Sequence, residues 1–257
     1  MLLAIDVGNT NTVFALHNGA EFVAEWRCNT ESVRTADQYF VWLSQLMGHQ
    51  DLAPEAIGEV VVSNTAPATL FNLRVLCDRY FGTRPLVVGK PECRLPVDVR
   101  VDNPAEVGAD RLVNTIAAHD RYGGDLIVVD FGTATTLDVV AEDGAYIGGA
   151  IAPGINLSLD ALHAAAAHLP RIDVTMPPHV LGTNTVHCMQ TGIYWGYVGL
   201  IEGIAKRIAE ERGRAMRLIA TGGLSPLFAR GSEMIEAFDT NLTMHGLVLI
   251  YNYNTSS

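Results

Sequence analysis

The sequence predicts an α/β protein with two similar lobes that face a shared cleft. Short apolar segments typical of strands alternate along the chain with longer segments of helical spacing. In addition, an Asp-x-Gly motif ends the first strand of each half, as DVGNT at 6–10 and as DFGTA at 130–134. Two copies so placed indicate related lobes, and a Gly-Gly pair where the pattern restarts predicts lobes of residues 1–122 and 123–257.

Turn residues divide the first half into short strands and helices. The expected strands are Leu2–Val7, Thr12–Leu16, Glu21–Arg27, Glu59–Ser63 and Pro85–Val88. A His-Asn-Gly turn at 17–19 joins the second and third strands into a hairpin. The expected helices are Ala36–Met47, Ala68–Phe81 and Ala105–Tyr122, the last capped by Asn103 ahead of Pro104. The proline-rich residues 91–105 are expected to form an irregular connection.

The second half repeats this alternation. The expected strands are Asp125–Phe131, Thr135–Val140, Tyr146–Ile151 and Met216–Ala220. A helix is expected from the Pro-Gly pair at 153–154 to about Ala167, and a long helix over Thr185–Arg212. The segment Thr221-Gly222-Gly223 opens a short helix, and Thr243–Tyr253 closes the chain.

Composition excludes several classes of protein. Hydrophobic residues make up 49% of the 257, enough for a buried core, and charged residues make up 18%. The formal net charge is -11, with no cluster of Lys or Arg. A nucleic-acid binder needs a basic surface to neutralise phosphates, and an anionic membrane surface attracts basic segments. Neither partner is therefore expected.

The cysteines and the N-terminus predict a cytoplasmic protein. The four cysteines are far apart and form no CxxC pair, which excludes a zinc ribbon and a disulfide scaffold and fits a reducing compartment. The N-terminus has no basic region ahead of its apolar run, so it is not a signal peptide. No stretch reaches the roughly 18 apolar residues of a membrane span.

The two Asp-x-Gly turns suit phosphate chemistry. Glycine lets the backbone approach a phosphate closely, and the N–H and hydroxyl groups that follow can bind its oxygens. An aspartate at a strand end can hold Mg²⁺, which takes one or two carboxylates together with phosphate. Two such loops would grip a triphosphate from both sides. The alternative is that Asp6 and Asp130 only cap tight hairpins.

A third candidate site is the Gly-Ala-Asp-Arg run at 108–111. Asp110 could accept a proton from a substrate hydroxyl, and Arg111 could bind an anion. The alternative is that Asp110 forms an i, i+4 pair with Glu106 or Asn114 on a solvated helix face. Glycine-rich segments at 148–154 and 220–223 could hold an adenosine, or could be ordinary turns at the start of helices.

The long helix carries a stripe of glycines at helical spacing. The stripe comprises Gly192, Gly196, Gly199 and Gly203. Each glycine costs about 1 kcal/mol relative to alanine inside a helix, so a stripe of four indicates close approach of another backbone. That backbone belongs either to the same chain or, as favoured here, to the same helix of a second subunit.

Familiar nucleotide and metal motifs do not explain the chain. The DFG at 130–132 is not accompanied by the GxGxxG loop of protein kinases, and there is no GxxxxGK[ST] P-loop. His163 and His168 do not have the i, i+4 spacing of a zinc helix. The chain also lacks the GxSxG of serine hydrolases.

Six motifs, taken in order, resemble the type III pantothenate kinases. They are DVGNT at 6–10, EVGADR at 106–111, DFGTATT at 130–136, GGAIAPGI at 148–155, GTNT at 182–185 and ATGG at 220–223. The resemblance covers essentially the whole chain. It implies two ribonuclease-H-like lobes of the actin, hexokinase and Hsp70 type, with mixed sheets. It also implies ATP-dependent phosphorylation of the primary hydroxyl of pantothenate, the first step of coenzyme A synthesis.

The resemblance also assigns roles to individual residues. The first phosphate loop, which binds ATP, is Asp6, Val7, Gly8, Asn9, Thr10, Asn11, Thr12 and Val13. Asp6 lies near Mg²⁺, Thr133 meets the nucleotide and Asp130 holds K⁺ or NH₄⁺. The pantothenate site is Gly108, Ala109, Asp110 and Arg111, with Asp110 as the general base, and Thr185 reaches that site across a homodimer interface. Members of the family often have an aromatic residue shortly before Asn-Pro, where a tyrosine contacts the substrate. This chain has Val101 and Asp102 there, so the resemblance does not extend to that contact.

Three other functions were weighed from the sequence alone. Another kinase or a phosphohydrolase of the same superfamily would share the phosphate loops without needing Gly-Ala-Asp-Arg. A non-catalytic regulator would be free to lose the aspartates, which are all present, and the acidic charge argues against DNA contact. An actin-like filament or chaperone would need inserted subdomains that 257 residues leave little room for.

Overall fold

The computed structural model describes residues 1–166, 168–228 and 230–256. The chain forms two compact units. Unit 1 comprises Met1–Pro96, Ala105–Ala117 and Thr243–Ser257, and unit 2 comprises Val97–Pro104 and Ala118–Leu242. The division of binding roles between residues 1–122 and 123–257 stays a prediction.

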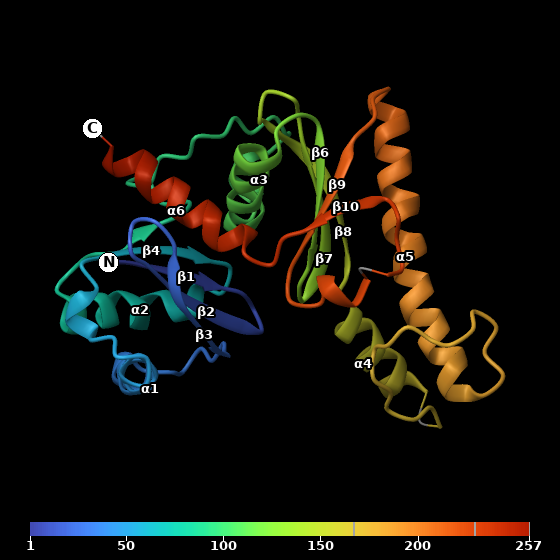
Figure 1. Cartoon of the computed structure of the whole chain (residues 1–257), viewed down its shortest axis with the longest axis horizontal. Helices are drawn as coiled ribbons and strands as arrows, with labels where there is room; N and C mark the ends of the chain where they lie inside the picture. Colours follow the sequence, from blue (N-terminus) through green and yellow to red (C-terminus); the bar gives the residue numbers. More distant parts are fainter. Residues whose placement is uncertain (167, 229, 257) are drawn as a thin grey trace. The chain divides into compact units, whose positions relative to one another are not determined.

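Unit 1 is built on a five-stranded mixed sheet (Figure 1). Its strands are β1 Leu2–Val7, β2 Asn11–His17, β3 Phe22–Asn29, β4 Glu59–Asn64 and β5 Leu86–Val87, in the order β3-β2-β1-β4-β5. The central strand β1 pairs antiparallel with β2 and parallel with β4. All five strands were expected from the sequence, with ends that differ by only one or two residues.

Unit 2 repeats this topology. Its strands are β6 Leu126–Phe131, β7 Ala134–Val140, β8 Tyr146–Pro153, β9 Arg217–Thr221 and β10 Ile235–Phe238, in the order β10-β9-β6-β7-β8. The central strand β6 pairs antiparallel with β7 and parallel with β9, just as β1 does with β2 and β4. The matching topology confirms the two related lobes. The short, bulged strand β10 was missed, because four residues give too little alternation to recognise.

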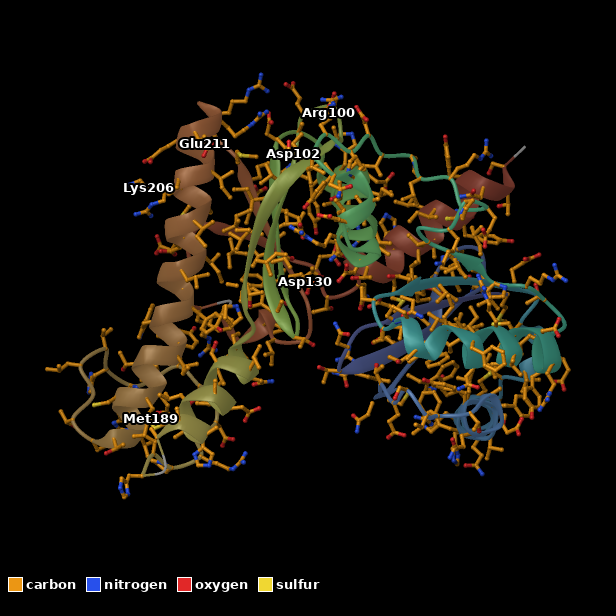
Figure 2. The ribbon with its side chains drawn as sticks, turned by 180° about the vertical axis from the view of Figure 1, so that it is seen from behind. Arg100, Asp102, Asp130, Met189, Lys206 and Glu211 are labelled. Atoms are coloured by element: carbon orange, nitrogen blue, oxygen red, sulfur yellow. The ribbon has the colours of Figure 1, made fainter. Side chains whose placement is uncertain are left out.

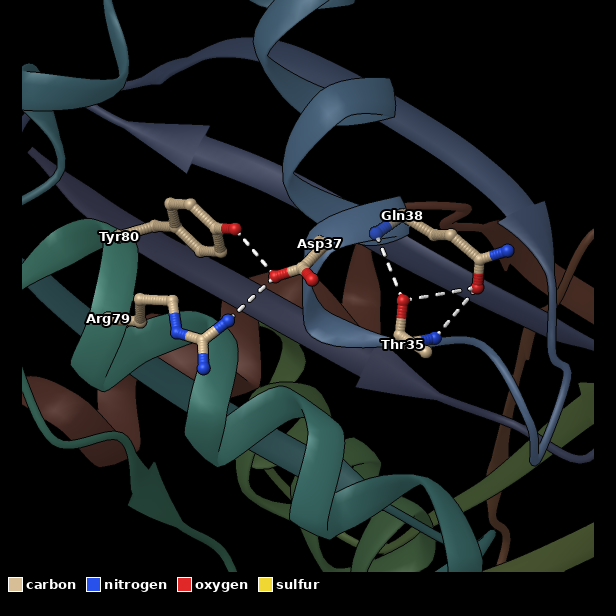
Figure 3. A network of polar contacts seen from close by, with 5 residues as sticks. All are labelled: Thr35, Asp37, Gln38, Arg79 and Tyr80. Carbon is tan, nitrogen blue, oxygen red and sulfur yellow. Dashed lines mark hydrogen bonds and ion pairs between the residues drawn. The ribbon is translucent and has the colours of Figure 1, made fainter.

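In unit 1, helices α1 Ala36–Gly48 and α2 Leu70–Leu76 cover one face of the sheet. Side chains of alternate β1 residues, such as Ile5, pack with α1 there, which leaves Asp6 on the opposite face. Helix α1 begins with a capping box between Thr35 and Gln38 (Figure 3). Beside it, the Asp37 carboxylate accepts hydrogen bonds from Arg79 at 2.9 Å and Tyr80 at 2.6 Å, which tie α1 to the turn after α2.

Two predicted helices of the first half differ in form. The expected helix 68–81 is a 3-10 turn at Pro67–Thr69, then α2, then a π-helical turn at Cys77–Phe81. The expected helix 105–122 is a 3-10 turn at Pro104–Glu106 followed by α3 Ala109–Tyr122. Gly108 is a poor helix former, so α3 begins after it. Asp110 therefore lies in the first turn of α3 rather than inside a longer helix.

In unit 2, α4 Ile155–Ala165 and α5 Thr185–Arg212 accompany the sheet, and α5 packs on one of its faces (Figure 1). The bounds of α5 match the prediction, whereas the predicted end of α4 at residue 167 lies outside the described residues. A 3-10 turn at Ser225–Phe228 follows β9. The last helix, α6 Leu242–Thr255, closes the chain.

The glycine stripe of α5 faces open space within the described chain. A Cβ added at Gly192, Gly196 or Gly199 would meet no described atom within 4 Å, and one at Gly203 would meet only a guanidinium nitrogen of Arg207, at 3.3 Å. The described residues of the chain therefore supply no close-packed backbone for this stripe. A second subunit as the partner of this stripe stays a prediction.

Candidate active site

The first Asp-x-Gly turn is a tight connection between β1 and β2. The Gly8 N–H donates to the Asn11 carbonyl oxygen at 3.0 Å, and a Cβ on Gly8 would lie 3.2 Å from the same oxygen. Behind the turn, the Thr12 hydroxyl is fully buried and lies 2.8 Å from the Thr30 hydroxyl. Asn9 and Thr10 at the tip are exposed. The turn thus presents an exposed tip on a rigid base.

Asp6 stands at the foot of this turn, with one oxygen buried and unpartnered among the described residues. It lies in register with Val13 of β2 and with the fully buried Ser63 of β4. Its Oδ1 is buried and has no hydrogen-bond partner among the described residues. Burial raises the pKa of Asp6 to about 7 and the charge of Asp110 adds to this, whereas the Ser63 hydroxyl and Arg27 lower it. Such a carboxylate is stabilised when a cation binds.

A single carboxylate with an unpartnered oxygen suits Mg²⁺, which can take its other ligands from substrate, better than it suits a metal that needs all its ligands from the protein. In the described part of the chain, no group of three or more His, Cys, Asp or Glu side chains could hold a metal ion. Magnesium is commonly held by one or two carboxylates, with substrate phosphates and waters as the other ligands. The donor set at Asp6 therefore fits Mg²⁺ that arrives with a phosphate.

Asp110 and Arg111 lie at the start of α3, in the same unit as Asp6. The Arg111 N–H donates to Asp110 Oδ1 at 2.9 Å. Burial raises the pKa of Asp110, against the opposing effects of that N–H and of the Arg111 charge. A Cβ on Gly108 would lie 2.6 Å from Asp110 Oδ1, so glycine makes room for the carboxylate. The side chain is thus half-buried in a fitted position, unlike one on a freely solvated face.

Helix α6 holds the first turns of α3 in place. The Thr243 hydroxyl donates to Asn114 Oδ1 at 2.7 Å, and the Thr115 hydroxyl donates to the Arg111 carbonyl at 2.9 Å. A Cβ on Gly246 would collide with the backbone of Val113, so the two helices approach closely. The sequence signal for this contact was a glycine within an apolar helical segment.

In unit 2, the second Asp-x-Gly turn is packed against two other glycines. The Gly132 N–H donates to the carbonyl of Ala134, two residues on, at 3.0 Å, whereas the Gly8 N–H of the first turn donates to Asn11, three residues on. The Gly154 N–H, at the start of α4, donates to the Thr133 carbonyl at 3.0 Å, and a Cβ on Gly154 would lie 2.6 Å from the Gly132 oxygen. Gly154 of the segment 148–154 and Gly222 of the segment 220–223 thus both pack closely against this turn.

Asp130 is the penultimate residue of β6 and pairs with Thr221 of β9 (Asp130 is labelled in Figure 2). Gly222 follows with φ +90°, and a Cβ there would lie 2.5 Å from Asp130 Oδ1 and 2.7 Å from both the nitrogen and the carbonyl oxygen of Phe131. Glycine is thus required for the chain after β9 to approach Asp130 this closely. The Asp130 carboxylate is a hard oxygen donor of the kind that suits an alkali cation or ammonium.

Thr185 is the first residue of α5, after the N-cap Asn184. It borders an apolar cavity of about 440 Å³ between α4 and α5, lined by side chains such as Leu162, Met189 and Ile193 (Met189 is labelled in Figure 2). The structure thus places residues 6–13 with Asp110 and Arg111 in unit 1, and Asp130, Thr133 and Thr185 in unit 2.

The sequence reasoning missed supporting residues around these sites. Ser63 beside Asp6, Thr30 behind the first turn and Gly246 beneath α3 belong to no motif. The first two are hydroxyl residues at strand ends, a signal that becomes specific only when the strand register is known.

The segment before Asn103 is hydrogen-bonded to β8 through the Arg100 N–H and the Tyr146 oxygen at 2.8 Å (Arg100 is labelled in Figure 2).

Comparison with known proteins identifies relatives over the full length. The family model for type III pantothenate kinase matches residues 2–207. A type III pantothenate kinase of Dinoroseobacter shibae is 65% identical over 254 residues, with 99% of each chain covered. One of Roseobacter denitrificans is 64% identical over 254 residues, covering 99% of this chain and 98% of its own.

Solved structures support the fold. Component A of (R)-2-hydroxyglutaryl-CoA dehydratase from Acidaminococcus fermentans has a TM-score of 0.56 at 13% identity, covering 99% of this chain and 98% of its own. At this identity the likeness concerns architecture alone. Within the described residues, none of the helices combines the length and hydropathy needed to cross a membrane.

Proposed function

Because the chain belongs to the type III pantothenate kinase family, it transfers a phosphoryl group from ATP to pantothenate, and we propose how its own residues carry out that transfer. Asp110 acts as the general base: it accepts the proton of the pantothenate primary hydroxyl as the oxygen bonds to the γ-phosphorus and ADP leaves. The observation that supports this role is a half-buried carboxylate with a raised pKa in a position fitted by Gly108.

The remaining residues of the 108–111 run position the substrate. Arg111 follows Asp110 in the first turn of α3, and its guanidinium offers the paired donors that suit the pantothenate carboxylate. The hydrogen bond between Thr243 and Asn114 fixes α3 to α6, so the first turns of α3 are held in place before substrate binds. Asp110 and Arg111 then need little rearrangement when pantothenate binds, so its hydroxyl lies near the base at once.

The two Asp-x-Gly turns bind the nucleotide. Residues 6–13 bind phosphates through backbone N–H and hydroxyl groups, and Thr133 contacts the nucleotide from the second turn. Asp6 would hold Mg²⁺, which when bound offsets the charge of the phosphates. Asp130 would hold K⁺ or NH₄⁺, with the Phe131 carbonyl as a neighbouring donor.

A homodimer completes the proposal. The open glycine stripe on α5 leaves room for another helix. Exposed large hydrophobic side chains in this unit include Leu157 of α4 and, before α5, Val180 and Leu181. Thr185 would contribute to the pantothenate site of the second subunit. A cytoplasmic location, as expected from the sequence, fits the substrates of this reaction.

The test is ADP release by purified protein with MgATP and K⁺, measured with and without pantothenate. The proposal expects release that requires pantothenate, with one ADP formed per phosphorylated product. A rate that ignores pantothenate would instead indicate a phosphohydrolase. Folded protein that binds ATP without releasing ADP under either condition would indicate a different acceptor or a regulator.

A further inference from the structure

Thr30 fixes the first phosphate turn at three points. It follows the last residue of β3, and its N–H donates to the Thr10 carbonyl at 2.9 Å. Its hydroxyl donates to the Gly8 carbonyl at 2.7 Å and lies 2.8 Å from the hydroxyl of Thr12. One half-buried side chain therefore connects both ends of the turn, although it belongs to none of the motifs.

The bond to Gly8 sets the direction of a backbone N–H group. The Gly8 carbonyl and the Asn9 N–H belong to one planar trans peptide, in which these two groups point in opposite directions. Since the Thr30 hydroxyl holds the carbonyl on the inner side of the turn, the Asn9 N–H faces the other way, on the exposed side. The Gly8 N–H is meanwhile held by the Asn11 carbonyl.

This orientation matters for an anion. A carbonyl oxygen turned toward a phosphate repels it, whereas an N–H group binds it. We infer that Thr30 is a positioning residue for ATP: its hydroxyl holds the Gly8–Asn9 peptide so that the Asn9 N–H, and not the Gly8 carbonyl, faces the phosphates. The identity of the nucleotide rests on the proposed function, but the geometry of the turn does not.

Thr65 provides a matched control. It too is half-buried, follows a strand end and donates its hydroxyl to a carbonyl of this region, that of Val7, at 3.0 Å. The Thr65 N–H donates to the same Val7 oxygen at 2.9 Å. Removing the Thr65 hydroxyl therefore leaves that carbonyl held, whereas removing the Thr30 hydroxyl breaks the bond that orients the Gly8 carbonyl.

The experiment measures the Kd for MgATP by calorimetry, without pantothenate, for wild type, Thr30→Val, Thr30→Ser and Thr65→Val. Thr30→Val is expected to weaken binding about tenfold, the usual effect of one lost hydrogen bond, while Thr30→Ser and Thr65→Val bind like wild type. In turnover assays, Thr30→Val raises the KM for ATP and leaves the KM for pantothenate unchanged. Thermal unfolding of each variant checks that the protein is folded at the assay temperature.

Several outcomes would overturn the inference. They are wild-type ATP affinity in Thr30→Val, an equal loss in Thr65→Val, failure of serine to restore binding, or no MgATP binding by wild type. Wild-type protein that binds MgATP with this dependence on Thr30, yet does not phosphorylate pantothenate, would reject the proposed function and leave the role of Thr30 standing.

Discussion

The charge of Asp110 raises the pKa of Asp6 within unit 1, second only to burial among the causes that bring it to about 7. Like charges disfavour each other's ionisation, so the ionised form of Asp6 is least favourable while Asp110 is charged. A cation bound at Asp6 would offset this repulsion and favour the ionised carboxylate.

This coupling predicts a pH-dependent stability without Mg²⁺. Asp6 has a folded-state pKa of about 7 and an ordinary value of 3.8, so the folded state favours the neutral acid. The resulting stabilisation is fully present below pH 3.8 and is lost as pH rises through about 7, on the order of 4 kcal/mol over the whole range. Urea unfolding between pH 5 and 8 should therefore show a steeper loss for wild type than for Asp6→Asn.

Added MgATP should reverse the difference. Binding of its Mg²⁺ at Asp6 requires the ionised carboxylate, so MgATP is expected to stabilise wild type more at pH 8 than at pH 6, and to stabilise Asp6→Asn less. Glu211→Gln, on the exposed surface of α5, serves as the control (Glu211 is labelled in Figure 2). Parallel pH profiles for wild type and Asp6→Asn would show that Asp6 does not titrate in this range.

Removing the base should affect turnover and spare nucleotide binding. Asp110→Asn keeps the side-chain shape and an oxygen for the Arg111 N–H, so the first turn of α3 should stay intact. We expect kcat to fall by about 10²-fold or more, with the Kd for MgATP within a factor of two of wild type. Steady-state kinetics and calorimetry test this, with Asp120→Asn on the exposed part of α3 as the control. Wild-type turnover in Asp110→Asn would reject the role.

The monovalent-cation site can be tested through Gly222. A Cβ at this position, which has φ +90°, would collide with Asp130 Oδ1 and the Phe131 backbone. Gly222→Ala should therefore displace the carboxylate and remove activation by K⁺ or NH₄⁺, whereas Gly58→Ala, at an open exposed position, should behave as wild type. Wild type should lose activity when Na⁺ replaces K⁺. Equal rates in K⁺, NH₄⁺ and Na⁺ would contradict the proposed role of Asp130.

The strand pattern and the two Asp-x-Gly motifs were enough to predict the duplicated fold. Each motif ends a central strand, so Asp6 and Asp130 could be placed at equivalent positions of two sheets before the topology was known. Helix starts were harder: the spacing before Asp110 is helical, but Gly108 delays α3 until residue 109. The binding roles of the site residues stay predictions until the experiments are done.

Some residues contact the site motifs although they are far from them along the chain, and these residues could not be predicted. Thr30 is far from Gly8 in sequence, and only the pairing of β2 with β3 brings the two together. Ser63 meets Asp6 because β4 lies parallel to β1 in one particular register. A shift of that register by one residue would put the side chain on the other face, so apolar patterning alone does not specify the contact.

The glycine stripe gives a prediction about assembly that separates stability from association. Gly196→Leu should leave the folded monomer intact, since no described atom lies within 4 Å of the new Cβ and leucine is the better helix former by about 1 kcal/mol. In a dimer that packs along this stripe, the same change should dissociate the subunits and abolish most activity. Light scattering and turnover measure the two effects, with Gly48→Leu at an open position of α1 as the control.

Mixing two defective variants tests whether Thr185 acts on the partner subunit's site. Thr185→Val retains Asp110, and Asp110→Asn retains Thr185, so each homodimer lacks one component in both of its sites. In a mixed dimer with the proposed exchange, one site combines the intact Asp110 of one subunit with the intact Thr185 of the other. Random reassociation makes half of the dimers mixed, so about a quarter of wild-type activity should return. If Thr185 served its own subunit, every site would remain defective and mixing would restore nothing.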